Sequence, residues 1–365
     1  MKVMTVLGTR PEIIRLSRLV PILDQACTHV LVHTGQNHDP LLSDVFFQEL
    51  GVRSPDLHLG VTASGFAEQA GQLLPKVGDA LTRAKPDRVL ILGDTNSGLS
   101  SLVAARMGIP VYHMEAGNRC YDDRVPEEIN RRVIDHASTI LMPYTHRSKE
   151  NLVREGIERE RIYVTGNPIR EVLTHYESRI QASTALERFE VQPKGYFLLT
   201  MHRAENVDDP DRLAALVEAV VRVSARHDVP VLFSVHPRTA DRLARAGLKP
   251  DPHRLRMVKP LGFFDFVKLE REARAVMSDS GTVQEECAIF RVPNVTIRDV
   301  TERPETIECG SNILSGADSK DVERAMTLVL SLPTCWDAPP EYQAVSVAST
   351  VARIVLGRLS VRRHL

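Results

Sequence analysis

The chain has 365 residues, of which 43% are hydrophobic and 25% charged, and its formal net charge is −1 at pH 7. This length exceeds what one hydrophobic core usually supports, so we expect two domains. The balanced charge gives no indication of a general nucleic-acid or acidic-membrane binder, and no apolar stretch suits a signal peptide or a membrane span.

The cysteines do not form a metal-binding pattern. No Cys-x-x-Cys spacing occurs, and the five positions are Cys27, Cys120, Cys287, Cys309 and Cys335. An odd, scattered set is typical of free thiols in a reducing compartment. We therefore expect a cytoplasmic protein without a thiolate metal site.

The first half of the chain alternates short apolar runs with helical patterns, as in a parallel sheet whose faces are covered by helices. We expect strands at residues 3–7, 29–33, 89–92, 111–113, 139–142 and 162–165. The expected helices run from the turn at residues 8–12 to about residue 25, and then over residues 65–83, 97–107, 126–136 and 148–155.

The turn after the first strand, Gly8 to Glu12, has two interpretations. Gly8 permits a sharp bend, and Thr9 with Pro11 suits the capped first turn of a helix. Free N–H groups at this turn, together with Arg10, would bind a phosphate group. The alternative is a capped helix with a surface arginine, and the turn has neither the Walker A nor the GxGxxG spacing.

Polar residues also follow the next strands. His38 lies in a cluster after residues 29–33, where a lone histidine is more often a surface residue than a ligand. Asp94 comes after residues 89–92, with Gly93 between them. It is either a catalytic carboxylate or the cap of the following helix.

The stretch from Tyr112 to Arg132 carries many charges of both signs and begins where a buried strand ends. Ligands of α/β proteins bind outside the carboxyl ends of the strands. Glu115 and Glu127 lie in this stretch, and clustered acids are expected to include some with a raised pKa, suited to proton transfer. The alternative is a solvated loop whose charges form salt bridges.

The second half of the chain repeats the alternation. We expect strands at residues 197–200, 229–234, 257–258, 275–278 and 294–297, and helices over residues 210–226, 319–330 and 345–359. Polar residues again follow the strand ends. The turn at Ser280 and Gly281 offers N–H groups to a phosphate.

This order predicts the α/β class, with two Rossmann-like domains facing a cleft that closes on a nucleotide-bearing ligand. We expect the first domain at residues 1–170 and the second at residues 171–342. A C-terminal helix at residues 343–365 is expected to pack back on the first domain.

Eight motifs resemble those of a known family. They are GTRPEIIRLS (8–17), GDT (93–95), HMEAGNR (113–119), VPEEINRR (125–132), TMHRAEN (200–206), SVHPR (234–238), SDSGTVQEE (278–286) and RDVTERPE (298–305). In this order and spacing, the chain resembles the non-hydrolysing UDP-N-acetylglucosamine 2-epimerase family over essentially its whole length. The resemblance implies a fold of the glycosyltransferase-B type.

The resemblance also implies the interconversion of UDP-N-acetylglucosamine and UDP-N-acetylmannosamine. UDP is eliminated from C1 with loss of the C2 proton, which leaves a 2-acetamidoglucal, and UDP then adds back with inversion at C2. A base is needed on one face of C2 and an acid on the other. The family implies no cofactor and no metal.

The family's functional positions carry over to this sequence one by one. The matches at catalytic positions are Asp94, Glu115, Glu127 and His202. The matches at substrate-binding positions are Arg10, Arg15, Leu261, Phe266, Ser280, Gly281, Thr282, Glu286 and Arg303.

The resemblance implies that these residues contact different parts of the substrate. Fixed cations and N–H groups stabilise the charge on a departing diphosphate, and we expect Arg10, His202, the Ser280-Gly281 turn and Arg303 to do so. Glu286 is expected at the ribose hydroxyls, and Phe266 with the backbone around Leu261 at the uracil. The sequence leaves open which carboxylate removes the proton and which returns it.

Some positions depart from the family pattern. Arg15 stands where the family usually has lysine, and Thr282 replaces the second glycine of an SGG turn. The segment TGQNHD (34–39) replaces a pattern linked in bacterial members to an allosteric substrate site. These variants favour alternative substrates, such as UDP-2,3-diacetamido-glucuronate or a UDP-N-acetyl-6-deoxyhexose.

The expected partner is a UDP-sugar, with no nucleic-acid or membrane partner, and the family implies a homodimer. Such an enzyme supplies precursors for polysaccharides or for an amino-sugar antibiotic. The alternative of another class is a non-catalytic sugar-nucleotide sensor. A glycosyltransferase of the same fold would share the contact at Glu286 but would not need three acids in the first domain.

Overall fold

The computed structural model describes residues 1–35, 40–63 and 65–358. The chain divides into two compact units. Unit 1 comprises Met1–Val172 and Glu341–Leu365, and unit 2 comprises Leu173–Pro340. Short strands alternate with helices in both units, and each unit builds a sheet of its own.

The described part of unit 1 forms a six-stranded sheet in the order β3-β2-β1-β4-β5-β6, in which all neighbours are parallel. This is the strand order of a Rossmann fold, and its direction reverses between β1 and β4. The strands are β1 (Lys2–Leu7), β2 (Thr28–His33), β3 (Leu57–His58), β4 (Arg88–Leu92), β5 (Val111–Met114) and β6 (Ile140–Met142).

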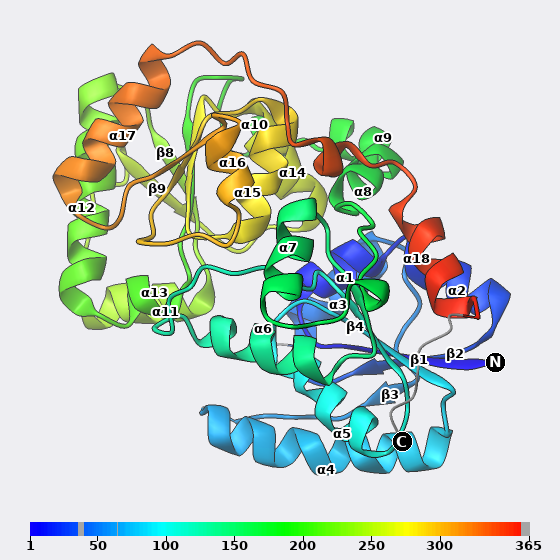
Figure 1. The fold of residues 1–365 in the computed structure, drawn as a ribbon. Coiled ribbons are helices and arrows are strands. Elements are labelled where there is room, and N and C mark those ends of the chain that lie inside the picture. Colours follow the sequence, from blue (N-terminus) through cyan, green and yellow to red (C-terminus); the bar gives the residue numbers. More distant parts are fainter. Residues whose placement is uncertain (36–39, 64, 359–365) are drawn as a thin grey trace. The chain divides into compact units, whose positions relative to one another are not determined.

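Helices connect these strands. They are α1 (Arg10–Leu16), α2 (Leu19–Ala26), α3 (Pro40–Glu49), α4 (Phe66–Ala84), α5 (Ser100–Arg106), α6 (Pro126–Ala137), α7 (His146–Arg154) and α18 (Val347–Leu356), with 3₁₀ turns η1 (Asn96–Leu99) and η2 (Arg159–Arg161). The chain crosses between the units at α8 (Ile169–His175) and η3 (Pro340–Gln343). Within unit 1, α18, drawn in red, lies beside α2, drawn in blue, although they come from opposite ends of the chain (Figure 1).

The single helix expected to run to about residue 25 is wrong. Two helices, α1 and α2, occupy this segment, and Ser17 is the C-cap of α1. Pro21 lies in α2, so it has no N–H to donate to the Ser17 carbonyl, and its ring crowds that carbonyl. The helix therefore breaks one turn before the proline.

The strand expected at residues 162–165 is also wrong within the described part of the chain. A single bridge joins Ile162 to Leu141, and the Thr165 N–H donates to the Pro143 carbonyl at 3.0 Å. Pro143 has no N–H with which to return a hydrogen bond, so the ladder does not continue.

Two expectations fall partly on residues outside this description. The polar cluster after β2 spans residues 34–39, and its residues 36–39, including His38, lie outside the described residues. The expected last helix extends to residue 359, which is also outside them, whereas α18 ends at Leu356.

Unit 2 repeats the topology of unit 1. Its described residues form a six-stranded parallel sheet in the order β12-β11-β10-β7-β8-β9, which reverses between β10 and β7. The strands are β7 (Phe197–Thr200), β8 (Val231–Ser234), β9 (Leu255–Val258), β10 (Ala275–Ser278), β11 (Asn294–Thr296) and β12 (Asn312–Leu314). The predicted α/β class with parallel sheets is confirmed in both units.

The helices of unit 2 connect its strands in the same way. They are α9 (Glu177–Gln181), α10 (Ala185–Arg188), α11 (Ala204–Val207), α12 (Pro210–His227), α13 (Pro237–Arg245), α14 (Phe263–Glu272), α15 (Gly281–Phe290), α16 (Pro304–Glu308) and α17 (Ser319–Ser331). Their lengths range from four residues in α10 and α11 to 18 in α12, and α9 and α10 precede β7, the first strand of the unit.

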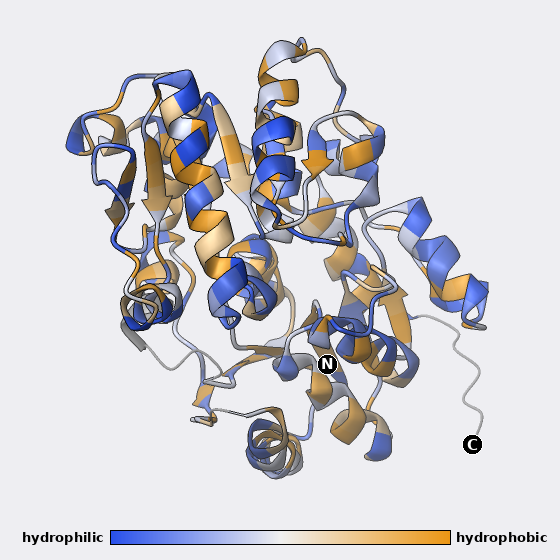
Figure 2. Cartoon of the chain, turned by 90° about the vertical axis from the view of Figure 1, so that its left-hand side faces the viewer, coloured by the Kyte–Doolittle hydropathy of each residue, from blue (hydrophilic) through white to orange (hydrophobic). Residues whose placement is uncertain are grey.

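Apolar strand residues form the two cores. Figure 2 shows orange, hydrophobic strands, while many helices carry both blue and orange residues. Val6 and Ile91 lie in the core of unit 1, and Leu199 and Phe233 in that of unit 2. Within the described segments, no helix is both long enough and apolar enough to cross a membrane.

Candidate active site

Asp94 follows β4, where the strand order of unit 1 reverses. Its Oδ2 accepts a hydrogen bond from Nε of Arg131 of α6 at 2.8 Å and lies 2.7 Å from Nη2 of the same arginine. The N-cap of η1 is Thr95, so Asp94 is not the helix cap considered as the alternative. The arginine orients the carboxylate, and 27% of the Asp94 side chain is exposed.

Glu115 follows β5 and is held in an unusual conformation. Its φ of +65° is a left-handed value, which typically costs a non-glycine residue about 1–3 kcal/mol and concentrates at functional sites. The side chain is 8% exposed, forms an ion pair with Arg15 of α1 and accepts a hydrogen bond from Tyr144 at 3.4 Å. A Cβ on Gly93 would lie 3.7 Å from its Oε2, so this carboxyl group lies beside the turn that carries Asp94.

A buried ion network fixes the turn after β4 and the loop after β5. His113 contacts Asp135 of α6 through Nδ1 and the Gly93 carbonyl through Nε2, both at 2.9 Å. Asp135 also accepts from the Gly117 N–H at 3.1 Å and lies 2.8 Å from Arg119. Burial would raise the pKa of Asp135, but His113 and Arg119 outweigh it and lower the pKa.

Two consecutive glutamates begin α6, and their surroundings differ. Glu128 is buried and accepts hydrogen bonds from the N–H groups of Cys120 and Tyr121, both at 3.0 Å, and from Arg131 at 2.8 Å. Burial alone would raise the pKa of Glu128, but these donors outweigh the effect of burial, so the pKa is lowered. Glu128 therefore fastens the loop, while Glu127 is only partly buried and accessible from outside.

The turn after β1 holds a carboxylate that the motif pattern did not single out. Glu12 is 1% exposed and accepts hydrogen bonds from the N–H groups of Gly8 at 2.9 Å and Thr9 at 2.7 Å. It also accepts from the hydroxyls of Thr9 at 2.8 Å and Thr95, next to Asp94, at 3.1 Å. Burial raises the pKa of Glu12 to about 7, although the hydrogen bonds act in the opposite sense.

This contact corrects the phosphate interpretation of the first turn. The N–H groups of Gly8 and Thr9, which would have to be free, bind the Glu12 carboxyl group. The turn is thus the capped start of α1, and the Arg10 guanidinium lies 5.7 Å from the Phe46 ring centroid. A raised carboxyl pKa occurs at Glu12, outside the stretch 112–132 in which we expected it.

In unit 2, His202 follows β7 and contacts a buried acid. Its side chain is 42% exposed, and its Nδ1 lies 3.1 Å from Oδ1 of Asp279, which follows β10. The other oxygen of Asp279 accepts from the N–H groups of His202 and Arg203, both at 2.9 Å. Burial would raise the pKa of Asp279, but His202 and these donors hold it well below its usual range. Asp279 therefore orients the imidazole and leaves Nε2 on the opposite side of the ring.

The turn after β10 leads into α15 with Ser280 as its N-cap, and the first N–H groups of a helix have no acceptor within it. A Cβ on Gly281 would lie 2.7 Å from Oε1 of Glu302 and 3.7 Å from Cζ of Arg303, so glycine allows these side chains to approach. The Thr282 and Ser280 hydroxyls are 2.8 Å apart. N–H donors and a guanidinium thus meet at this turn, although Glu302 shares the space.

Buried ion pairs hold the arginines around this turn. Arg303 pairs with Glu285 of α15, and Arg298 pairs with Glu302 at 2.8 Å. Removing one partner of such a pair leaves an uncompensated buried charge, which makes the arrangement rigid.

The positions expected to contact uridine lie on α14, on α15 and just before α14. Glu286 is 5% exposed, and the partly buried Leu261 and Phe266 pack against a core that includes Val283 and Cys287. An apolar surface suits contact with a nucleotide base, and a carboxylate suits contact with the ribose hydroxyls.

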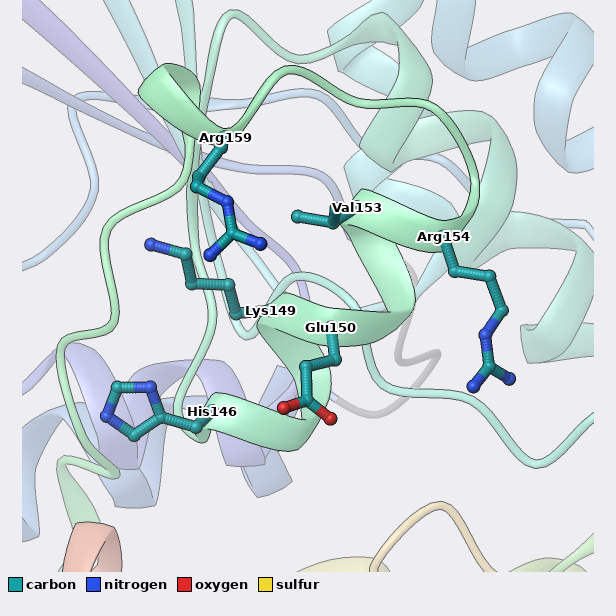
Figure 3. A pocket seen from close by; sticks show the side chains of 6 residues that line it. All are labelled: His146, Lys149, Glu150, Val153, Arg154 and Arg159. Carbon is teal, nitrogen blue, oxygen red and sulfur yellow. The ribbon is translucent and has the colours of Figure 1, made fainter.

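A separate hollow in unit 1 contains none of the predicted site residues. Figure 3 shows it between α7 and η2, and its lining residues are His146, Lys149, Glu150, Val153, Arg154 and Arg159. The ends of Lys149 and Arg159 lie near each other, while Arg154 points away (Figure 3). Lys149 also donates to the Ile162 carbonyl at 3.2 Å.

The predicted residues thus form two groups. Unit 1 contains Asp94, Glu115, Glu127, Arg10 and Arg15, and unit 2 contains His202, Leu261, Phe266, Ser280, Gly281, Thr282, Glu286 and Arg303. The motifs did not point to the buried acids that orient them. Glu12 and Asp279 lie inside the quoted motifs, and Asp135 lies one helical turn after Arg131, which was the available signal.

Comparisons with known proteins identify the family of the chain. A model of the UDP-N-acetylglucosamine 2-epimerase family matches residues 23–356. A UDP-N-acetylglucosamine 2-epimerase of Methanocaldococcus jannaschii is 39% identical over 349 residues, which cover 93% of this chain and 95% of the relative. A UDP-2,3-diacetamido-2,3-dideoxy-D-glucuronate 2-epimerase of Pseudomonas aeruginosa is 37% identical over 322 residues, covering 87% and 89%, respectively.

Solved structures show the same fold. The Methanocaldococcus jannaschii UDP-GlcNAc 2-epimerase in complex with UDP-GlcNAc and UDP matches with a TM-score of 0.92 and 38% identity, covering 97% of this chain and 99% of that one. The glycosyltransferase WaaG, at 14% identity and a TM-score of 0.61, shares the fold alone and covers 98% and 100% of the two chains. The chain therefore has a fold of the glycosyltransferase-B type, and it belongs to the UDP-N-acetylglucosamine 2-epimerase family of isomerases.

Proposed function

We propose that this chain interconverts UDP-N-acetylglucosamine and UDP-N-acetylmannosamine without hydrolysing the nucleotide. A base removes the C2 proton, the electron pair of the C2–H bond forms the C1–C2 double bond, and the pair of the C1–O bond leaves with UDP. This anti elimination gives a 2-acetamidoglucal and needs no oxidant. UDP then adds back at C1 while an acid protonates the other face of C2.

The conformation of Glu115 is the observation that carries the proposal. This residue keeps a left-handed backbone in a buried setting, paired with Arg15 and next to the turn of Asp94. Backbone strain of this kind persists only where surrounding contacts enforce it, and it is concentrated at active sites and ligand-binding sites. Asp94 and Glu127 retain accessible sides, so unit 1 offers three carboxylates for proton transfer at C2.

The residues of unit 2 bind UDP in this proposal. His202, oriented by Asp279, and the first N–H groups of α15 stabilise the diphosphate as it gains charge, together with Arg303. Glu286 accepts hydrogen bonds from the ribose hydroxyls. Leu261 and Phe266 contact the uracil, while Arg10, Arg15 and Thr282 complete the substrate contacts.

A modified UDP-sugar is the second candidate substrate. The Pseudomonas aeruginosa relative at 37% identity is named for UDP-2,3-diacetamido-2,3-dideoxy-D-glucuronate, and this chain has an arginine at position 15. Chemistry at C1 and C2 is the same for both sugars, so the same acids serve either substrate. A UDP-N-acetyl-6-deoxyhexose would react in the same way.

Incubation with a panel of UDP-sugars tests the activity. We expect ¹H NMR to show conversion of UDP-N-acetylglucosamine to the manno epimer, with UDP retained on the sugar. Faster conversion of the diacetamido-glucuronate would favour the second substrate. Binding without conversion of any sugar would indicate a sensor, transfer to an acceptor would indicate a glycosyltransferase, and release of free sugar would indicate a hydrolysing enzyme.

We further propose that the enzyme works in the cytoplasm as a homodimer and supplies amino-sugar nucleotides for polysaccharide or antibiotic assembly. The family resemblance supports the dimer, and the five free cysteines support a reducing compartment. Light scattering after size exclusion should give twice the chain mass. A monomer at working concentrations would contradict the dimer and leave the proposed activity in place.

A further inference from the structure

Unit 2 contains a pair of buried acids where α14 packs on α15. Glu270 of α14 is 0% exposed, and Glu286 of α15 is 5% exposed. The two side chains lie close enough for their carboxyl groups to interact. Two carboxylates repel when both are ionised, so this contact requires an explanation.

The Cys287 thiol and the charge of Arg271 favour a negative charge on Glu270, but burial and the neighbouring Glu286 outweigh them. The Cys287 thiol donates to Oε1 at 3.7 Å, and the buried Oε2 has no N–H or O–H donor among the residues that the structure describes. Tyr196 lies nearby, but its hydroxyl donates to the Leu269 carbonyl.

The nearby cations have other partners. Arg271, the neighbour of Glu270 on α14, donates to both oxygens of Glu177 at 2.7 Å. The Lys194 ammonium donates to two main-chain carbonyls, at 3.0 Å and 2.9 Å. Glu272, on the same helix, adds a further negative charge within this part of unit 2.

One shared proton accounts for the contact. Burial and the neighbouring Glu286 raise the pKa of Glu270 well above its usual range. Burial and the same acids raise the pKa of the Cys287 thiol, so it remains a donor. Glu270 therefore holds the proton of the pair, and Glu286 is the partner that reaches the surface.

We propose that Glu270 is a positioning residue for nucleotide recognition, whose protonated carboxyl donates to one oxygen of Glu286 and directs the other toward the ribose hydroxyls. This inference rests on the proposed function, in which Glu286 contacts the ribose of a UDP-sugar. A carboxylate held in this way accepts from a hydroxyl pair without first losing side-chain freedom. The pair therefore selects ribonucleotides over nucleotides that lack these hydroxyls.

The test compares the calorimetric affinities of UDP and 2′,3′-dideoxy-UDP. Their ratio isolates the ribose hydroxyls, because both ligands carry the same base and diphosphate. We expect wild type to prefer UDP. Glu270→Met keeps the size of the side chain but removes the donor, and it should lower the ratio about tenfold by weakening UDP alone.

Conservative and control variants separate positioning from structure. Glu270→Gln should keep the wild-type ratio, because its amide N–H replaces the acid proton and its carbonyl accepts from Cys287. Glu272→Gln, on the same helix, should also keep it. Glu270→Leu is a second apolar replacement should the methionine variant fail to fold.

If the wild-type protein binds UDP, the proposed function stands, and the variants then test the role of Glu270 alone. Three outcomes would overturn that role. An unchanged ratio in the apolar variants would do so. A loss of equal size for both ligands would indicate a structural effect instead, and a lowered ratio in Glu270→Gln would contradict the shared proton. Absence of UDP binding by wild type would overturn the proposed function itself and this inference with it.

Discussion

Each unit buries a carboxylate at the point where its strand order reverses, but the two carboxylates behave in opposite ways. Glu12 joins the turn after β1 to Thr95 in the turn after β4. Asp279 follows β10 and accepts from the main chain after β7. Burial raises the pKa of Glu12 to about 7, whereas the pKa of Asp279 is held well below its usual range.

The difference lies in the neighbouring imidazole. Both carboxylates accept main-chain N–H groups, so hydrogen bonding alone does not separate them. Only Asp279 contacts an imidazole, that of His202, and this imidazole is the largest favourable influence on its ionisation. The buried Asp279 carboxylate thus stays ionised beside an imidazole, whereas main-chain and hydroxyl donors alone do not prevent the pKa of Glu12 from rising.

Asp279→Ala should remove the ionised carboxylate that binds the main chain after β7 and His202. We expect a loss of about 3 kcal/mol of stability at pH 7, because the N–H donors and His202 lose a buried partner. The folded-state pKa is lowered, so this stability is present above the unfolded pKa of about 4 and is lost as the pH falls below it. Urea unfolding at pH 7 and pH 3 measures it, and an equal difference at both would contradict the ionised state.

Glu12→Gln should have the opposite pH dependence. The folded pKa is raised from 4.5 to about 7, so its contribution is fully present below pH 4.5 and is lost as the pH rises through 7. Relative to wild type, the variant should gain about 3 kcal/mol between pH 4.5 and pH 8. Urea unfolding at these two pH values measures the gain. A difference that does not change with pH would show that Glu12 is not neutral in the folded protein.

The acids assigned to chemistry in unit 1 should affect turnover without affecting UDP. Asp94→Asn, Glu115→Gln and Glu127→Gln should each lower turnover by at least ~100-fold, because each removes a proton-transfer group. Calorimetry should show UDP affinity close to wild type. Glu150→Gln, an exposed position of α7, is the matched control. Near wild-type turnover in all three variants would refute the acid–base assignment.

His202→Ala should show the complementary pattern in unit 2. We expect UDP to bind about tenfold more weakly, because a donor to the diphosphate is lost. His253→Ala, at an exposed position, is the control. Unchanged UDP affinity in calorimetry would remove His202 from the diphosphate.

The sequence predicts the class of the fold because buried parallel strands appear as short apolar runs, such as the run at residues 89–92 that becomes β4. It misses elements that depend on tertiary packing. α14 begins with an apolar run and carries Glu270, yet no helix was expected there. β12 has only three residues, and short elements of this kind gain their stability from the sheet they join.

The candidate site is predictable in position but not in its contacts. The ends of apolar runs point to Asp94 and Glu115, because ligands bind there in α/β proteins. Their partners lie far away in the sequence, with Arg131 37 residues after Asp94 and Arg15 100 residues before Glu115. No local periodicity reports such contacts. The occupation of the first turn by Glu12 is likewise visible only in the structure.

The central claim is that one carboxylate, acting as a base, removes the C2 proton, and that a protonated carboxyl group returns another proton to the opposite face. Its most direct test is the deuterium content at C2 of the epimer formed from UDP-N-acetylglucosamine in heavy water. We expect one solvent deuterium at C2 for every product molecule, and strongly reduced incorporation in Glu115→Gln. An epimerised product that retains its original C2 hydrogen would contradict the claim.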